Sequence, residues 1–443
     1  MNASSAFRNS DGSVNSGETT SMSSNQENSV DTSQSLSRED EIEAEYRSLV
    51  DVEGERHRKR RLSLPVLKGR HSFSLWSFAK SLIGRDLTRI TMPVHFNEPL
   101  SFTQRICEDL EYAEILHKAH ECDSRLDRIA HIAAFACSCF ASAEGRFWKP
   151  FNPLLGETFE LIQEDCQYAV VCEQVCHHPP VTAMHCEAEN WSLWQEYKLD
   201  IRFRGQYIKV IPTGIVHLRM KSDNLHYSWK KPTTTIHNII LGRLWVDNEG
   251  EVVVTCHQTK ETASVRFQSY SKAGKSFKDL KGEVRSSPGN VERLLRGAWD
   301  KGLDSYKVKS VLPKNNYESG AHVHSLWRIK ERPVESPKMY GFTKFAMGLN
   351  DIDIGVCSTD TRMRPDVRLL ELGHVDDAVK EKHRLEEKQR AARRTRDAAK
   401  ATWKPRWFVP LRDADTGIVA HVYSGGYWKA KMASNFENVP DIY

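Results

Sequence analysis

The chain has 443 residues, 39% of them hydrophobic and 28% charged, so its length allows one large domain or two to three ordinary ones. Its 63 basic and 59 acidic residues give a net charge of +4, which is too balanced to indicate a nucleic-acid-binding protein. There is no run of about 18 apolar residues, no signal peptide at the start and no spacing framework among the ten cysteines. We therefore expect a cytoplasmic protein with reduced thiols.

Residues 1–64 are expected to form a disordered N-terminal tail. They are rich in Ser, Asn, Thr, Asp and Glu, and such a stretch cannot bury enough surface to offset its chain entropy. A basic run from Arg56 to Arg61 near the end of the tail precedes Ser63. Ser63 is a candidate site for a basophilic kinase and the run a candidate patch for anionic lipid, while an ordinary solvated linker remains the alternative.

Residues 72–86 predict an amphipathic helix, because apolar residues recur at helical spacing. The polar face carries little charge, so any role at a membrane would depend on the apolar side. A helix packed on its own core and a movable cover both remain open. The apolar residues are Leu75, Phe78, Ala79, Leu82 and Ile83, with Trp76 beside them.

Residues 101–143 predict two further helices, and the periodicity then changes to that of strands. Over 197–204, apolar residues alternate with charged ones, which is typical of a strand with one solvated face. Many short strands favour a mainly β fold with flanking helices, a barrel or a sandwich, over a parallel α/β sheet. Similar runs follow at 206–211, 214–220, 235–246, 251–257 and 263–270.

Residues 376–403 predict a helix, since Lys, Arg, Glu and Ala dominate and neither Gly nor Pro interrupts them. Charges on almost every side are typical of a solvated helix, unless some of them face an anionic ligand. Lys382, Glu386 and Arg390 recur at i, i+4 and i+8 and therefore form one stripe.

Residues 173–180 read Glu-Gln-Val-Cys-His-His-Pro-Pro, in which paired prolines fix an extended chain after two adjacent imidazoles. One interpretation is a metal site, although clamp spacings such as Cys-x2-Cys are missing. Another is a catalytic pair of Cys176 and His177, although the prolines remove donors that an oxyanion hole would need. The candidate metal ligands are Cys166, Cys172, Cys176, His177, His178, His185 and Cys186.

The third interpretation of this stretch is anion recognition. His177 and His178 can donate hydrogen bonds to a phosphate, whose negative charge would favour their protonated forms. Upstream, Lys149 and Asn152 supply a cation and an amide on a turn bracketed by prolines. The stripe on the C-terminal helix would add further cations.

Because it contains these three sequence motifs, the chain resembles the oxysterol-binding protein-related family, in its short form without a leading pleckstrin-homology domain. The family signature is Glu-Gln-Val-Ser-His-His-Pro-Pro, and residues 173–180 reproduce it with Cys176 in place of the serine. A thiol donates and accepts hydrogen bonds only weakly, so a turn hydrogen bond worth about 1 kcal/mol is in doubt. Further matches lie at 90–94, 96–99, 149–157, 361–366, 385–390 and 439–443.

This resemblance implies a large incomplete antiparallel β-barrel that encloses a lipid tunnel, with an N-terminal amphipathic lid and flanking helices. The tail at 1–64 would precede a lipid-transfer domain at 65–443. Within that domain we expect the lid at about 70–98, helices at 101–143, the barrel at about 150–285 and a C-terminal helical region at 286–443.

The family's activity implies a lipid-transfer protein and not an enzyme. It would bind sterol and phosphatidylinositol 4-phosphate one at a time, without cofactor, metal or nucleic acid, and exchange them at membranes of the endoplasmic reticulum, Golgi, plasma membrane or endosomes. A metal-binding protein or enzyme that depends on the Cys/His cluster is the alternative. The implied headgroup residues are Lys149, Asn152, His177, His178, Lys382, Glu386 and Arg390, and the implied lid residues are Leu75, Trp76, Phe78, Leu82 and Ile83.

Residues 45–51 carry a weaker signal for a partner. Downstream of an acidic stretch, they are similar to a degenerate form of the acidic and aromatic tract with which lipid-handling proteins bind a receptor of the endoplasmic reticulum. Leu49 departs from the small residue expected there. The strand patterns leave open whether the second lipid is cholesterol, an oxysterol or phosphatidylserine.

Overall fold

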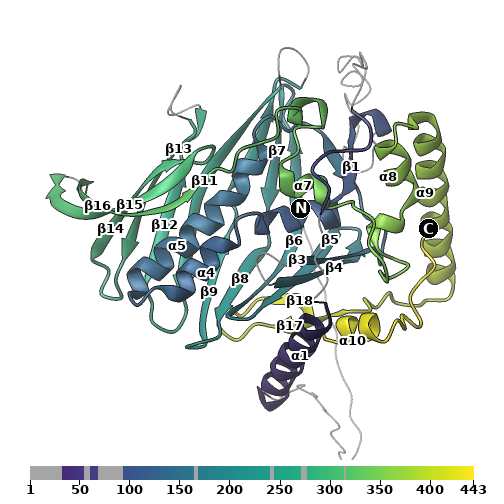
Figure 1. Ribbon diagram of the computed structural model, residues 1–443, viewed down its shortest axis with the longest axis horizontal. Coiled ribbons are helices and arrows are strands. Elements are labelled where there is room, and N and C mark those ends of the chain that lie inside the picture. The colour runs from purple at the N-terminus through teal and green to yellow at the C-terminus, as the bar shows by residue number, and fades with distance from the viewer. Residues whose placement is uncertain are drawn as a thin grey trace, which may run out of the picture.

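The fold is built around one curved antiparallel sheet of 14 strands (Figure 1). The computed structural model describes residues 32–53, 60–67, 93–163, 168–239, 244–270, 277–313 and 316–443. The strand order is β16-β15-β14-β13-β12-β11-β10-β7-β6-β5-β4-β3, and β8 and β9 form a second connection between β6 and β11. Among the described residues, strands β3 and β16 end this order and do not pair with each other, so the barrel is incomplete, as expected.

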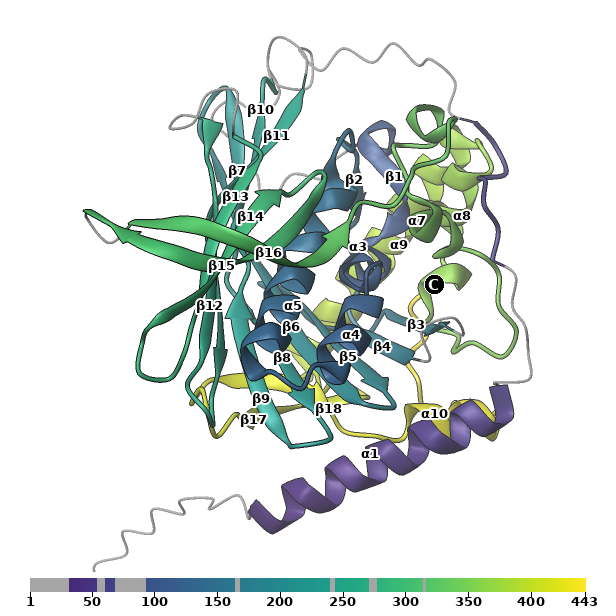
Figure 2. The same ribbon diagram turned by 60° about the vertical axis from the view of Figure 1, so that its left-hand side comes forward.

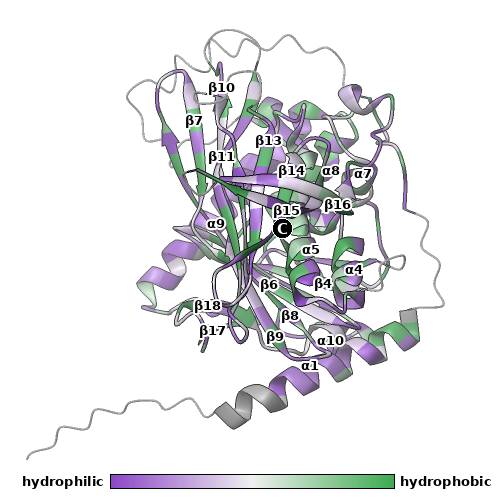
Figure 3. Ribbon diagram, turned by 90° about the vertical axis from the view of Figure 1, so that its left-hand side faces the viewer, coloured by the Kyte–Doolittle hydropathy of each residue, from purple (hydrophilic) through white to green (hydrophobic). Residues whose placement is uncertain are grey.

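The strands are β3 (Thr158–Gln163), β4 (Tyr168–His177), β5 (Pro180–Ala188), β6 (Trp191–Phe203), β7 (Tyr207–Pro212), β8 (Ile215–Met220), β9 (Leu225–Lys230), β10 (Thr233–His237), β11 (Trp245–Cys256), β12 (Thr262–Phe267), β13 (Asp279–Arg285), β14 (Val291–Ala298), β15 (Gly302–Leu312) and β16 (Asn316–Arg328). Hydrophobic and hydrophilic residues alternate along several of them (Figure 3). This alternation separates an apolar inner face from a polar outer face.

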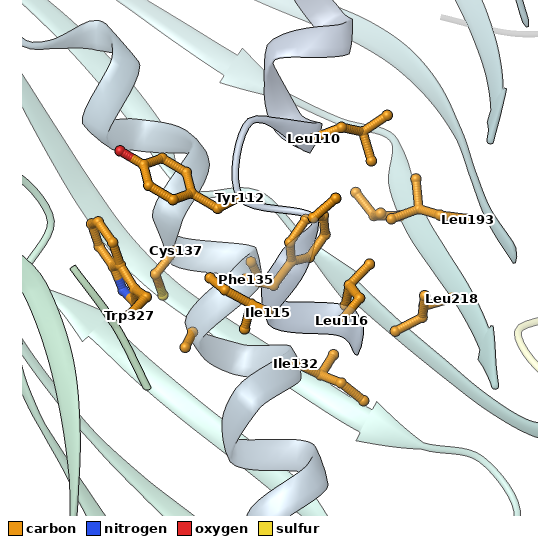
Figure 4. Packing of buried hydrophobic residues seen from close by; sticks show 14 of the residues in the cluster. Leu110, Tyr112, Ile115, Leu116, Ile132, Phe135, Cys137, Leu193, Leu218 and Trp327 are labelled. Carbon is orange, nitrogen blue, oxygen red and sulfur yellow. The ribbon is translucent and has the colours of Figure 1, made fainter. Parts of the chain in front are cut away.

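Helices cover the inner face of the sheet. Helix α4 (Glu114–Glu121) leads into α5 (Arg125–Ser138), which begins where Ser124 Oγ accepts a hydrogen bond from the backbone N–H of Asp127. Ile132 of α5 points toward Leu218 on the sheet (Figure 4), and both belong to the main hydrophobic core. The inner face is therefore closed on this side by helices.

Shorter elements connect these parts. A parallel pair, β1 (Asn97–Ser101) and β2 (Lys149–Phe151), lies beside α8 (Pro365–Glu371) and α9 (Val375–Ala398). Two further short helices are α3 (Phe102–Arg105) and α7 (Lys344–Gly348), and the 3-10 turns are η1 (Val94–Phe96), η2 (Ile106–Leu110), η3 (Cys139–Ala143), η6 (Ser336–Lys338) and η7 (Thr361–Met363).

The C-terminal segment follows the outside of the sheet. Strands β17 (Phe408–Arg412) and β18 (Val419–Tyr423) form a hairpin, and α10 (Tyr427–Met432) follows it. Strand β18 packs on β5 and β6, and α10 lies against α1 (Thr32–Glu53), as Figure 2 shows for the two helices. A second hydrophobic cluster joins α1 and the C-terminal segment to β4 and β5.

The prediction of a disordered tail is wrong for part of residues 1–64, because residues 32–53 form α1. Ile42, Tyr46 and Leu49 recur at i, i+4 and i+7, and all three are buried in the second cluster. The carboxylate of Glu45 accepts hydrogen bonds from the backbone N–H groups of Gly426 and Lys429 at 2.9 and 3.1 Å. Helix α1 is thus fixed by one apolar stripe and one buried carboxylate.

The predicted C-terminal helical region also needs correction, since the large sheet continues to Arg328 and the hairpin β17–β18 follows α9. Most side chains of β15 and β16 are half-buried or exposed, so these strands lack the regular change between buried and exposed residues that marks a half-buried strand. The predicted lid residues Leu75, Trp76, Phe78, Leu82 and Ile83 lie outside the described residues.

Candidate functional site

The turn at residues 152–157 is fixed by a buried ion-pair network. Glu157 accepts a hydrogen bond from the backbone N–H of Leu154 at 3.0 Å and pairs with Arg364 Nη1 at 2.8 Å. The same Arg364 nitrogen donates to the carbonyl of Asn152 at 2.9 Å, and Asp366 binds the other side of the guanidinium. The network holds the backbone of the turn, and the side chain of Asn152 is left exposed on it.

The turn is also joined to the end of β4. The backbone N–H of Gly156 donates to Gln174 at 3.0 Å, and the N–H of Gln174 donates to Glu157 at 2.8 Å. Gly156 has a φ of +84°, and a Cβ there would lie 2.9 Å from Trp403 Cη2, so glycine is required on both grounds. These bonds place the turn beside His177, at the end of β4.

His177 is the last residue of β4 and His178 follows it in the turn to β5, with their ring centroids 4.6 Å apart. The pKa of His177 is lowered to about 4, chiefly by burial and next by the neighbouring His178, while the hydrogen bond with the backbone of Pro153 opposes the shift. His177 is therefore neutral at pH 7 in the free protein. Its more exposed neighbour, His178, completes the pair at the surface.

Gln389 of α9 connects the histidine pair to the turn. Its Oε1 accepts a hydrogen bond from the backbone N–H of Leu155 at 2.8 Å, and its Nε2 lies 2.9 Å from His177 Nε2. Gln389 was not among the headgroup residues predicted from the sequence. Its position seven residues after Lys382 could have indicated it, because this spacing places both residues on one side of a helix.

The stripe on α9 has the charge arrangement expected from its spacing. Glu386 lies between two cations, with Lys382 Nζ 3.3 Å from Oε1 and Arg390 Nη2 3.4 Å from Oε2. The pKa of Lys149 is lowered, because surrounding protein desolvates its ammonium and because the positive charge of Lys382 is near. Within the described segments Lys149 forms no ion pair, so positive charge predominates here.

We name this group the anion site: Lys149, His177, His178, Lys382, Glu386 and Arg390. Three separate segments supply it, the turn at 149–157, the end of β4 and α9. Asn152 lies on the same turn with its side chain exposed. The arrangement offers convergent N–H donors and cations, which suits a ligand with several anionic oxygens. It offers no activated nucleophile.

The Cys/His cluster does not assemble in the part of the chain that the structure describes. Cys172 Sγ lies 3.6 Å from Cys107 Sγ in the main core, and Cys186 is buried in that core as well. His185 pairs with Glu187 at 2.9 Å, and Cys166 lies outside the described residues. No group of potential metal ligands among the described residues includes a member of this cluster.

The basic run before Ser63 contributes structural contacts. Arg60 Nη2 donates to the carbonyl of Ile162 at 2.9 Å, and Arg61 pairs with the buried carboxylate of Glu371. Ser63 is exposed, whereas Leu64 is buried in the core. A kinase that recognises the two arginines would therefore require residues 60–64 to detach from the domain first.

The tract at 45–51 is part of α1. Tyr46 and Leu49, which would have to face a receptor, are 3% and 0% exposed. Any receptor that binds this tract would have to displace α1 from the second cluster.

In the described segments, no helix has an apolar stretch long enough to cross a bilayer.

The chain is similar to known proteins over most of its length. Residues 74–432 match the family model described as oxysterol-binding protein. Mouse oxysterol-binding protein 2 is 41% identical over 405 residues, covering 87% of this chain and 44% of its own length, so this chain spans less than half of that relative. Human oxysterol-binding protein-related protein 2 is 35% identical over 428 residues, covering 87% of this chain and 88% of its own.

Solved structures have the same fold. The Osh1 ORD domain in complex with cholesterol superposes with a TM-score of 0.82 at 34% identity, covering 91% of this chain and 99% of that one. The Osh3 ORD of Saccharomyces cerevisiae in complex with PI(4)P gives 0.74 at 29% identity, covering 87% and 99%. Both the family match and the fold lead to one conclusion: the chain belongs to the oxysterol-binding protein family.

Proposed function

We propose that the protein binds sterol and phosphatidylinositol 4-phosphate alternately and exchanges them between membranes. The observation that carries this proposal is the convergence of Lys149, Lys382, Arg390 and the histidine pair beside a curved sheet with an apolar inner face. The phosphomonoester of the headgroup needs several hydrogen-bond donors at one point, and the acyl chains of the lipid need an apolar surface that excludes water. The related domains bound to cholesterol and PI(4)P support both ligands.

Each residue of the anion site has a proposed role. Lys149 and Lys382 neutralise the phosphate, and His177 and His178 donate hydrogen bonds to its oxygens. Arg390 adds a further donor, while Glu386 holds it and Lys382 in position. Asn152 donates its side-chain amide from the turn. No covalent bond is made or broken in this cycle, and the protein acts from the membrane surface.

Phosphoinositide binding should be coupled to proton uptake. His177 is neutral in the free protein because its pKa is lowered to about 4, and a phosphate dianion would raise that pKa by favouring the imidazolium. Affinity should therefore rise as pH falls from about 7.5 to about 6.5, above the second pKa of the phosphate near 6. Calorimetry in buffers of different ionisation enthalpy should show proton uptake that is lost in His177→Gln. Equal heats in all buffers would contradict the role of His177.

Gln389→Ala should weaken binding of the headgroup without unfolding the protein. The substitution removes the bonds to Leu155 and His177, worth about 1 kcal/mol each, so affinity should fall about tenfold to thirtyfold. Binding to vesicles with phosphatidylinositol 4-phosphate measures the loss, and thermal unfolding measures stability. Arg394→Ala, on an exposed side of the same helix, is the control. Equal losses in both variants would remove Gln389 from the site.

The lid remains a proposal from the sequence alone. If the apolar residues of 72–86 cover the bound lipid, deletion of residues 66–86 should slow transfer and shorten retention of sterol while circular dichroism stays close to that of the intact protein. A deletion variant that transfers at the full rate would show that these residues are not a lid.

Transfer between two vesicle populations tests the proposed function. Donor vesicles carry a fluorescent sterol and acceptor vesicles carry phosphatidylinositol 4-phosphate. The proposal predicts sterol movement that accelerates when the phosphoinositide is present in the acceptor. Transfer at the same rate with phosphatidylinositol in its place would contradict exchange.

A further inference from the structure

A second polar cluster lies on the outer face of the sheet, away from the anion site. His217 of β8 and His226 of β9 alternate with Leu218 and Tyr227, which are buried in the main core, so the histidines face outward. Their side chains are nevertheless only 3% and 1% exposed. Trp194 stacks on both rings, with centroid distances of 5.1 and 5.4 Å. The turn between β17 and β18 completes the enclosure.

Three potential metal ligands converge in this cluster. His217 Nδ1 lies 3.0 Å from His226 Nε2, and Asp413 Oδ2 lies 4.0 Å from His217 Nδ1. One ligand atom from each residue lies within 4.8 Å of the other two. Ligands about 2 Å from a zinc ion lie about 3.3 Å from one another in a tetrahedron, so small side-chain movements would bring all three to one ion.

The surrounding hydrogen bonds orient these atoms inward. Asp415 Oδ2 lies 2.6 Å from His226 Nδ1, so a proton on Nδ1 leaves a lone pair on His226 Nε2, which accepts a hydrogen bond from His217 Nδ1 at 3.0 Å. An ion between the two rings would replace this hydrogen bond, with the proton of His217 held on its Nε2 instead of Nδ1. Asp413 Oδ1 accepts hydrogen bonds from the backbone and hydroxyl of Thr416, both at 2.7 Å, so Oδ2 remains on the side of His217. A carboxylate behind a ligating histidine is the usual support of a protein metal site.

We propose that this cluster binds a divalent transition-metal ion of the zinc class. His217 Nδ1, His226 Nε2 and Asp413 Oδ2 bind the ion, water occupies the fourth position, and Asp415 positions His226. The ion joins the turn of the C-terminal hairpin to β8 and β9. It is separate from the Cys/His cluster of 166–186.

The position of the site indicates what the ion would stabilise. Just before the hairpin, the backbone N–H groups of Arg406 and Trp407 donate to Glu173 at 2.8 and 2.9 Å. Glu173 lies on β4, the strand that ends at His177. A bound ion would therefore hold the far end of a segment that is attached to the strand of the anion site.

Metal titration of the full chain tests this proposal. After removal of metal with a chelator, Co²⁺ should bind one per chain with the strong visible absorption of four-coordinate cobalt, and Zn²⁺ should displace it. Zn²⁺ should also raise the melting temperature. His217→Gln and Asp413→Asn should each weaken binding about 100-fold, and Asp415→Asn about 10- to 100-fold. Asp413 lies on a partly exposed turn, so its variant should remain folded.

His257→Gln is the matched control, because this ring lies 4.8 Å from the ring of His226 yet bonds to Ser228 instead. It should bind metal as the unmodified protein does. No binding at micromolar free Zn²⁺ would overturn the proposal. Equal binding by the unmodified chain, His217→Gln and Asp413→Asn would place the metal elsewhere and overturn it too.

Discussion

Replacing His177 and His178 together by alanine should abolish phosphoinositide extraction from vesicles while sterol binding survives. The two imidazoles belong to the anion site and not to the apolar core. Loss of two charge-assisted hydrogen bonds costs about 3–6 kcal/mol, or about 10²- to 10⁴-fold in affinity. Extraction of each lipid by the same preparation is the measurement.

Two other histidines provide a matched control for this double substitution. His322 and His324 lie on β16 with side chains 50% and 43% exposed, so their replacement by alanine removes the same groups from another surface. The control should extract both lipids normally. Retained phosphoinositide extraction by the His177→Ala, His178→Ala protein would show that the headgroup binds elsewhere.

Lys382→Glu should give a loss of similar size. The side chain of Lys382 is only 12% exposed and pairs with Glu386, so a carboxylate there would repel both Glu386 and the phosphate and would remove one of the two neighbouring ammonium groups, Lys149 being the other. Disruption of a buried charge pair costs about 2–5 kcal/mol, which corresponds to about 30-fold to several thousandfold in Kd. Binding to phosphoinositide vesicles at two salt concentrations measures it.

Lys380→Glu is the control for this charge reversal. Lys380 lies on the same helix, but its side chain is 75% exposed and paired with Asp377. Arg393 would be an unsuitable control. The pKa of His177 is lowered mainly by burial and by His178, but the charge of Arg393 contributes as well, so Arg393 is close to the anion site. Equal losses from Lys380→Glu and Lys382→Glu would indicate attraction to a general basic surface instead of a defined site.

Spacing on one helix was enough to predict part of the site. Lys382, Glu386 and Arg390 recur every four residues, and in the structure the carboxylate pairs with both cations. The chemistry of Lys149 and the histidine pair gave anion recognition as one of three interpretations, and the family resemblance was needed to choose among them, since these residues lie on other segments. Periodicity within one element cannot indicate which elements the fold brings together.

The role of Gln389 and the formation of helix α1 could not be predicted, because both depend on contacts with residues far away in the sequence. The sequence around Gln389 is that of an ordinary charged surface helix. Only the folded positions of Leu155 and His177 give the amide of Gln389 a role. Helix α1 has a polar composition, and its short apolar stripe is stable because the C-terminal segment provides a surface for it. Average composition therefore predicted disorder where tertiary contacts produce a helix.

The proposed exchange requires that sterol and phosphoinositide occupy one binding site in turn. Native mass spectrometry of the protein, after equilibration with vesicles that contain both lipids, tests it directly. We expect chains with one sterol or one phosphatidylinositol 4-phosphate, in proportions that follow the vesicle composition. Chains that carry both lipids at once, at a level that rises with each of them, would contradict exchange through a shared site.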